Sequence, residues 1–101
     1  MTELSGAQRT WLRGRAHGLR PAVQMGREGM SEGLLAAIDS ALEASELVKV
    51  QLSGDRDERR RVAAEMTRRL DAECVGQVGR MAILYRRQPD PERRTVVVPE
   101  G

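Results

Sequence analysis

The sequence predicts an α/β protein in which three helices and four strands alternate around a four-stranded mixed sheet. Three observations support this prediction. Apolar residues recur at helical spacing in three segments, strand-like apolar runs lie between them, and glycine, proline or capping residues separate the segments. The order helix–strand–helix–strand–helix–strand–strand indicates a two-layer sandwich with right-handed crossovers. A chain of 101 residues is large enough for one such domain.

The first helix is predicted from Ser5 to about His17. Ser5 and Gln8 have the spacing of a capping box, in which each side chain accepts a hydrogen bond from the backbone of the other. A glycine ends the helix, and Arg20-Pro21 turns the chain into the first strand. The residues expected to face the core are Trp11, Leu12 and Ala16.

The next three elements follow from periodicity. Residues 21–25 read as a strand, and Ser31 is a suitable N-cap for a helix over residues 31–44. A second strand is predicted over residues 47–52, where every other residue is apolar. The apolar residues at helical spacing in the second helix are Leu34, Leu35, Ile38, Ala41 and Leu42.

The third helix is predicted to start at Asp55, with Glu58 completing a second capping box. Its apolar face consists of Val62, Ala63, Met66 and Leu70. Its outer face holds Arg59, Arg60, Arg61, Arg68 and Arg69, which we interpret as solvated and paired with Asp57, Glu58, Glu65 and Asp71.

Two further strands are predicted over residues 75–78 and 81–86, with Gly79-Arg80 between them. The second is almost continuously apolar, which is typical of a central strand. Prolines then interrupt the pattern, so we assign residues 1–87 to the domain and 88–101 to a C-terminal tail, with a short edge strand over 95–98.

The charge is unevenly distributed along the chain. The net charge is +2, but residues 1–30 carry +3 and residues 31–55 carry −4. Such asymmetry indicates one side that faces a polyanion. Sixteen of the 17 basic residues are arginine, which either favours phosphate recognition or reflects GC-rich codons.

Several function classes are not expected. No segment has the length of a membrane helix or the pattern of a signal peptide, and a lone Cys74 suits a reducing cytoplasm. No metal-ligand spacing is present, and His17 and Cys74 are too far apart in sequence to indicate a catalytic pair. We therefore expect no enzyme activity, no metal and no cofactor.

The strongest candidate site is Gly26-Arg27-Glu28-Gly29, between the first strand and the N-cap of the second helix. Glycines let the backbone take positive φ and approach a ligand closely, and the helix start directs free N–H groups at it. A phosphate suits this geometry. The alternative is a structural turn without a ligand, because a second G-x-x-G occurs at residues 76–79 and because Glu28 would repel an anion.

Aromatic residues are too few for a base-stacking surface: the chain has no Phe, one Trp and one Tyr. Because the chain has no dinucleotide fingerprint, a nucleic-acid backbone is the expected source of a phosphate at the turn. RNA binding would then depend on phosphate, 2′-hydroxyl and shape, and would weaken as salt rises. We expect arginines and one lysine to extend the contact made by the loop. These residues are Arg13, Arg15, Arg20, Lys49, Arg80 and Arg86.

Several separated motifs follow one another in a specific order along the chain: Leu4-Ser5, Gln8, Leu12, Ala16, Leu19-Arg20-Pro21, Gly26-Arg27, Gly29-Met30-Ser31, Glu46-Leu47-Val48-Lys49-Val50, Gln77-Val78-Gly79 and Leu84-Tyr85-Arg86. Together these motifs resemble the CRM domain, and specifically the small bacterial YhbY-type proteins. The resemblance covers about residues 4–87, and Thr95 to Pro99 is similar to the short terminal strand of the family.

This resemblance implies a fold like the C-terminal domain of bacterial translation initiation factor three. It also implies RNA binding during maturation of the large ribosomal subunit, with the G-x-x-G loop as the RNA contact. Our own prediction is a monomeric, cytoplasmic protein with this activity. Glu28 departs from the family pattern, which has a basic, polar or small residue there. No membrane or small-molecule substrate is implied.

A second hypothesis is a protein-interaction module. The second helix is acidic and could dock a basic ribosomal protein. The acidic residues in question are Glu32, Asp39, Glu43 and Glu46.

Overall fold

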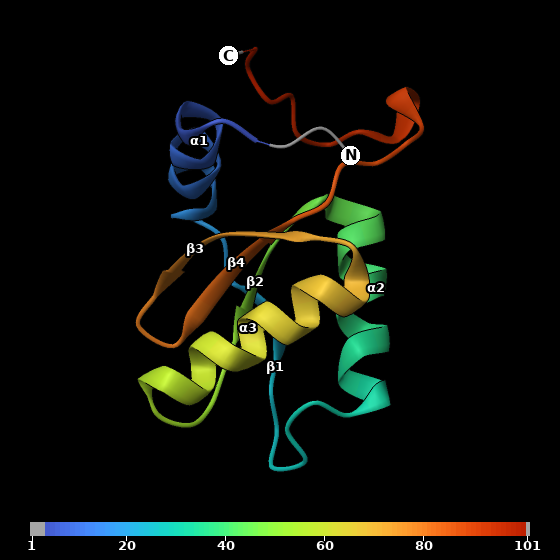
Figure 1. The fold of residues 1–101 in the computed structure, drawn as a ribbon. Coiled ribbons are helices and arrows are strands. Elements are labelled where there is room, and N and C mark those ends of the chain that lie inside the picture. The colour runs from blue at the N-terminus through green and yellow to red at the C-terminus, as the bar shows by residue number, and fades with distance from the viewer. Residues whose placement is uncertain (1–3, 101) are drawn as a thin grey trace.

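A computed structural model describes residues 4–100 of the chain. It confirms the predicted order of helices and strands (Figure 1). The elements are α1 (Gly6–Ala16), β1 (Pro21–Gln24), α2 (Glu32–Ser45), β2 (Leu47–Gln51), α3 (Arg56–Leu70), β3 (Glu73–Val78), β4 (Met81–Tyr85) and a 3₁₀ turn, η1 (Pro91–Arg93).

Local hydrogen bonds explain why the helices begin where they do. In α1, the Gln8 N–H donates to Ser5 Oγ at 3.1 Å, and the Ser5 N–H donates to Gln8 Oε1 at 2.9 Å. In α3, the Glu58 N–H donates to the Asp55 carboxylate at 2.8 Å. Both predicted capping boxes are therefore confirmed.

None of the helices within residues 4–100 is long and apolar enough to cross a membrane.

The four strands form one mixed sheet in the order β1-β2-β4-β3. β1 is parallel to β2, and the other two pairings are antiparallel. β4 is central, as its apolar run predicts. In the register, Gln24 and Met81 lie on either side of Gln51, so the end of β1 and the start of β4 share one end of the sheet.

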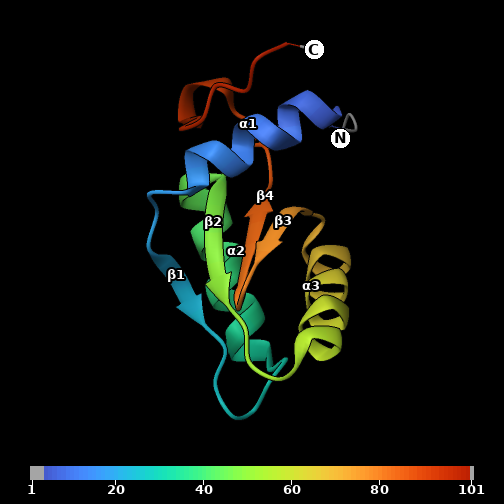
Figure 2. The same cartoon turned by 90° about the vertical axis from the view of Figure 1, so that its left-hand side faces the viewer.

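The core has two parts, one on each face of the sheet. α2 and α3 cover one face and bury residues such as Ile38, Met66 and Leu84. This is the predicted two-layer unit. α1 lies across one end of the opposite face, where Leu12 and Ala16 are fully buried (Figure 2). α1 therefore adds partial cover on the second face.

The edge strand expected over residues 95–98 is not formed, and this prediction was wrong. The Glu46 carboxylate, fully buried, accepts the backbone N–H groups of Gln88 at 2.7 Å, Thr95 at 2.5 Å and Val96 at 3.0 Å. Those N–H groups are thus unavailable for a strand ladder. Val96 instead packs against the α1 side of the core.

Candidate nucleic-acid interface

The G-x-x-G turn follows β1 at the far end of the molecule from α1. The Gly29 N–H donates to Gly26 O at 3.2 Å, and the Ser31 N–H donates to Gly29 O at 2.9 Å. Gly29 has φ +66°, a left-handed conformation that glycine adopts without strain. Gly26 is not in this conformation, so only the second glycine is required by the backbone of the turn.

The turn projects into solvent (Figure 1). Arg27 and Glu28 are exposed, and a Cβ added at Gly26 or Gly29 would meet no atom within 4 Å. A shallow hollow of about 460 Å³ lies between the turn and the first turn of α2. The backbone is therefore accessible to a large ligand.

The start of α2 adds hydrogen-bond donors to this hollow. Ser31 caps the helix by accepting the Leu34 N–H at 3.0 Å. The N–H groups of Glu32 and Gly33 make no hydrogen bond within residues 4–100. Free N–H groups at the positive end of a helix dipole are suited to an anion.

Two carboxylates lie near the turn, and they differ in their partners. Glu32 forms an ion pair with Arg69 of α3 at 3.1 Å, which offsets its charge. Glu28 is exposed and forms no ion pair in the described part of the chain. Only Glu28 therefore opposes an anion at the loop.

One further basic residue of the predicted RNA contact lies at the end of the sheet where the loop lies. Arg80 is exposed in the turn that precedes Met81, and Met81 is in register with Gln51 at the end of β2. Arg27 and Arg80 thus share this end.

Three other basic residues of the predicted RNA contact lie away from the loop. Arg20 precedes β1, and the Arg15 guanidinium lies 5.7 Å from the centroid of the Trp11 ring on α1. Lys49 lies within β2 and donates from Nζ to His17 O at 3.2 Å. These residues lie toward the end covered by α1.

Arg13 and Arg86 are engaged in contacts that hold the fold together. Arg13 Nη1 donates to Val75 O at 2.8 Å and joins α1 to β3. Arg86, whose side chain is 18% exposed, donates to Asp39 Oδ1 at 2.8 Å and to Leu70 O at 2.9 Å. Their guanidinium groups thus have internal partners.

The acidic face proposed for protein docking is largely neutralised or buried. Arg86 pairs with Asp39 at 2.8 Å and with Glu43 at 3.8 Å, and Arg93 pairs with Glu43 at 3.4 Å. Glu46 is fully buried, so its assignment to a docking face was wrong. The N–H groups of Gln88, Val96 and Thr95 outweigh the effect of burial and lower the pKa of Glu46.

The two residues that could have served as a catalytic pair, Cys74 and His17, make contacts within the fold. Burial raises the pKa of the Cys74 thiol, which donates to Gly76 O at 3.4 Å. His17 is the C-cap of α1. Among the described residues, no group of three or more His, Cys, Asp or Glu side chains could hold a metal ion.

The arginines of α3 behave differently from one another. Arg68 pairs with Glu65, as the interpretation of a solvated face predicts. Arg56, Arg59 and Arg60, however, line a cavity beside β3. Their spacing of three and four residues places them on one helix face, and this spacing was the signal that could have identified them.

A family model for the CRS1/YhbY (CRM) domain matches residues 4–86. The chain belongs to this family. Its CRM domain is 40% identical over 87 residues to an RNA-binding protein of Haemophilus influenzae, a match that covers 85% of this chain and 88% of the relative. A "Probable RNA-binding protein" of Pseudomonas aeruginosa is 33% identical over 91 residues, covering 89% and 88% of the two chains.

A solved structure supports the same fold for this CRM domain. The solution structure of a hypothetical protein from Staphylococcus aureus, proposed to bind RNA, superimposes with a TM-score of 0.83 at 30% identity. The match covers 96% of this chain and all of the other. The mixed α/β fold predicted from the sequence is therefore confirmed.

Proposed function

We propose that this CRM domain binds RNA through residues 26–29 and the first turn of α2, and that it acts in maturation of the large ribosomal subunit. The observation that supports it best is the exposed turn, in which the left-handed Gly29 leads into a helix start with unpaired N–H groups. Relatives named as RNA-binding proteins match most of the chain.

In this proposal a phosphate oxygen accepts the N–H groups of Glu32 and Gly33. Arg27 adds a guanidinium that can bind a phosphate through two parallel hydrogen bonds. Arg80 extends the positive surface at the same end of the sheet. The proposed partner is ribosomal RNA in a precursor of the large subunit, and the proposed location is the cytoplasm.

Recognition would not rely on aromatic stacking. Tyr85 is 3% exposed and lies in the α1-side core. Trp11 is half-buried beneath the Arg15 guanidinium. Phosphate contacts then supply most of the affinity, so binding should weaken steeply as salt rises.

The test is binding to a protein-free transcript of large-subunit ribosomal RNA, measured by fluorescence anisotropy over a range of salt concentrations. Arg27→Glu replaces an attractive charge with a repulsive one and should reduce affinity at least about tenfold at low salt. Arg87→Glu makes the same charge change at an exposed site beyond β4 and is the control.

Association with precursor large subunits provides a second measurement. Wild-type protein and the Arg87→Glu control should co-sediment with these particles, whereas Arg27→Glu should not. Equal co-sedimentation of the two variants would show that the loop is not the contact. Binding to particles without binding to protein-free RNA would instead favour docking to a ribosomal protein.

A further inference from the structure

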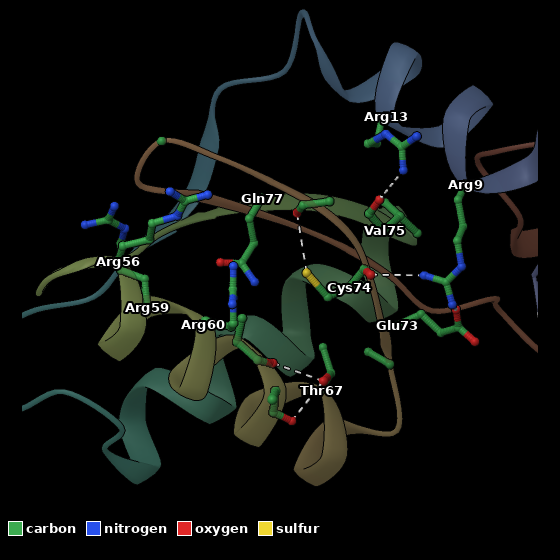
Figure 3. A pocket seen from close by; sticks show the side chains of 15 residues that line it. Arg9, Arg13, Arg56, Arg59, Arg60, Thr67, Glu73, Cys74, Val75 and Gln77 are labelled. Atoms are coloured by element: carbon green, nitrogen blue, oxygen red, sulfur yellow. Dashed lines mark hydrogen bonds and ion pairs between the residues drawn. The ribbon is translucent and has the colours of Figure 1, made fainter. Parts of the chain in front are cut away.

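The largest hollow described on the molecule lies between α3 and β3, away from the G-x-x-G turn. It has a volume of about 930 Å³, compared with about 460 Å³ at the turn. Five arginines line it, from two different helices: Arg9, Arg13, Arg56, Arg59 and Arg60 (Figure 3). We call this hollow the α3–β3 groove.

The α1 side of the groove is a built arrangement of guanidinium groups. Arg9 Nη1 donates to Cys74 O at 3.1 Å, and Arg13 Nη1 donates to Val75 O at 2.8 Å. A Cβ at Gly76 would lie 2.5 Å from Arg13 Cδ, so the absence of a side chain there makes room for Arg13.

The α3 side of the groove contains charges without counterions. Arg56 and Arg60 are exposed and form no ion pair within residues 4–100. Arg59 donates to Gly54 O at 2.6 Å. The groove has one carboxylate in its lining, Glu73, which Arg9 already pairs at 2.6 Å.

The bottom of the groove, between its α1 side and its α3 side, consists of small and polar side chains. Cys74 and Gln77 lie between the arginines of α1 and those of α3 (Figure 3). Ala63, Ala64 and Gly79 contribute little side-chain volume. Such a floor offers no bulky apolar anchor of the kind that dominates protein–protein interfaces.

The geometry also disfavours a peptide that adds to the sheet. β3 is an edge strand, and strand addition requires its unpaired backbone groups. The carbonyls of Cys74 and Val75 already accept hydrogen bonds from arginines, and the pairing of β3 with β4 is irregular between Cys74 and Gly76. Charge complementarity therefore favours a polyanion without a need for strand pairing.

We propose that the α3–β3 groove binds the phosphate backbone of a second RNA segment, separate from the segment held by the G-x-x-G turn. This inference rests on the proposed function in taking RNA as the partner. The N-terminal half of α3 follows β2, which ends beside the start of β4, so the α3 side of the groove lies toward the end of the sheet that carries the turn, while Arg9 and Arg13 lie toward the α1 end. One RNA could then engage both surfaces.

The decisive variant removes two unpaired charges from the groove, Arg56→Gln with Arg60→Gln. The control, Arg61→Gln with Arg87→Gln, removes the same charge from exposed arginines that do not line the groove. With the protein-free ribosomal RNA transcript, the slope of log affinity against log salt should fall by about 2 for the groove variant. Its affinity at low salt should fall about tenfold relative to the control.

A second variant tests the groove without changing net charge. Gly76→Ala places a methyl group where the Arg13 side chain now lies and should displace that guanidinium. Weaker RNA binding is expected, with a lower melting temperature because Arg13 also joins α1 to β3 through Val75 O. RNA affinity is therefore compared at a temperature where the variant is fully folded, and an affinity equal to that of wild type would count against the groove.

The outcomes separate this inference from the proposed function. If Arg27→Glu weakens RNA binding but the groove variant matches its control, the groove inference is wrong and the loop proposal stands. If the wild-type protein does not bind the transcript, both are wrong. If the groove variant retains RNA affinity but loses affinity for polyglutamate, the groove serves an acidic protein and not RNA.

Discussion

Two sets of charged residues, at opposite ends of the sheet, differ in their burial and in their internal hydrogen bonds. At the end near the tail, Glu46 is fully buried, Arg86 is partly buried, and each makes several internal hydrogen bonds. At the other end, Arg27, Arg80 and Glu28 are exposed and have no ion-pair partner among the described residues. The difference indicates that the charges of Glu46 and Arg86 serve stability, while those of Arg27, Arg80 and Glu28 are available for a ligand.

The Glu46 carboxylate should give the largest effect on stability. Glu46→Ala removes the acceptor of three backbone N–H groups and leaves these donors without a partner. We expect the free energy of unfolding to fall by about 3 kcal/mol, since each unsatisfied buried donor costs roughly 1–3 kcal/mol. Urea unfolding measures this change. Glu92→Ala, at an exposed position in η1, is the control and should leave the midpoint almost unchanged.

The pH dependence of unfolding provides a second measurement on the same group. The folded state lowers the pKa of Glu46 from its ordinary value of 4.5. The carboxylate therefore stabilises the fold above the unfolded pKa, and this contribution disappears as pH falls through the folded pKa. Glu46→Gln should show a smaller loss of stability than wild type as pH falls from above 4.5 through the folded pKa. Identical pH profiles would mean that the carboxylate charge does not hold the tail.

These two ends also show which parts of the molecule the sequence could predict. The helices, the strands and the G-x-x-G turn follow from local signals such as the Ser5–Gln8 and Asp55–Glu58 capping boxes, and the structure confirms these elements. Relations between distant residues could not be predicted in this way. Glu46 reads as one more acid on an acidic helix, because its partners lie 42 to 50 positions further on.

The C-terminal tail shows that local strand propensity can also be overridden by contacts with distant residues. Three consecutive valines at residues 96–98 favour a strand locally. The backbone N–H of Val96 is nevertheless committed to Glu46, and residues 94–100 form no strand. Arginines are a similar case: composition alone does not distinguish Arg86, which is bound internally, from Arg80, which is exposed.

The contrast between Arg86 and Arg80 gives the next largest expected effect. Arg86→Gln removes an ion pair to Asp39 and leaves Leu70 O without this donor, so we expect a loss of about 1.5 kcal/mol in the free energy of unfolding. Arg80→Gln should leave that free energy within about 0.5 kcal/mol of wild type. The RNA affinities should rank in the reverse order, with Arg80→Gln the weaker binder. If Arg86→Gln weakens RNA binding more than Arg80→Gln in the folded protein, the assignment of the two ends is wrong.

The smallest effect distinguishes the two glycines of the turn. A methyl group meets no atom within 4 Å at either position, but Gly29 has φ +66° and Gly26 does not have positive φ. Gly29→Ala should therefore cost about 1 kcal/mol in the free energy of unfolding, because alanine is strained in the left-handed region. Gly26→Ala should be neutral or stabilising by about 0.5 kcal/mol, since it restricts the unfolded chain. Equal costs in urea unfolding would contradict the left-handed turn. Because a methyl group at Gly26 also stands over the exposed backbone, a loss of RNA affinity in Gly26→Ala without a loss of stability would be evidence that RNA approaches the turn closely.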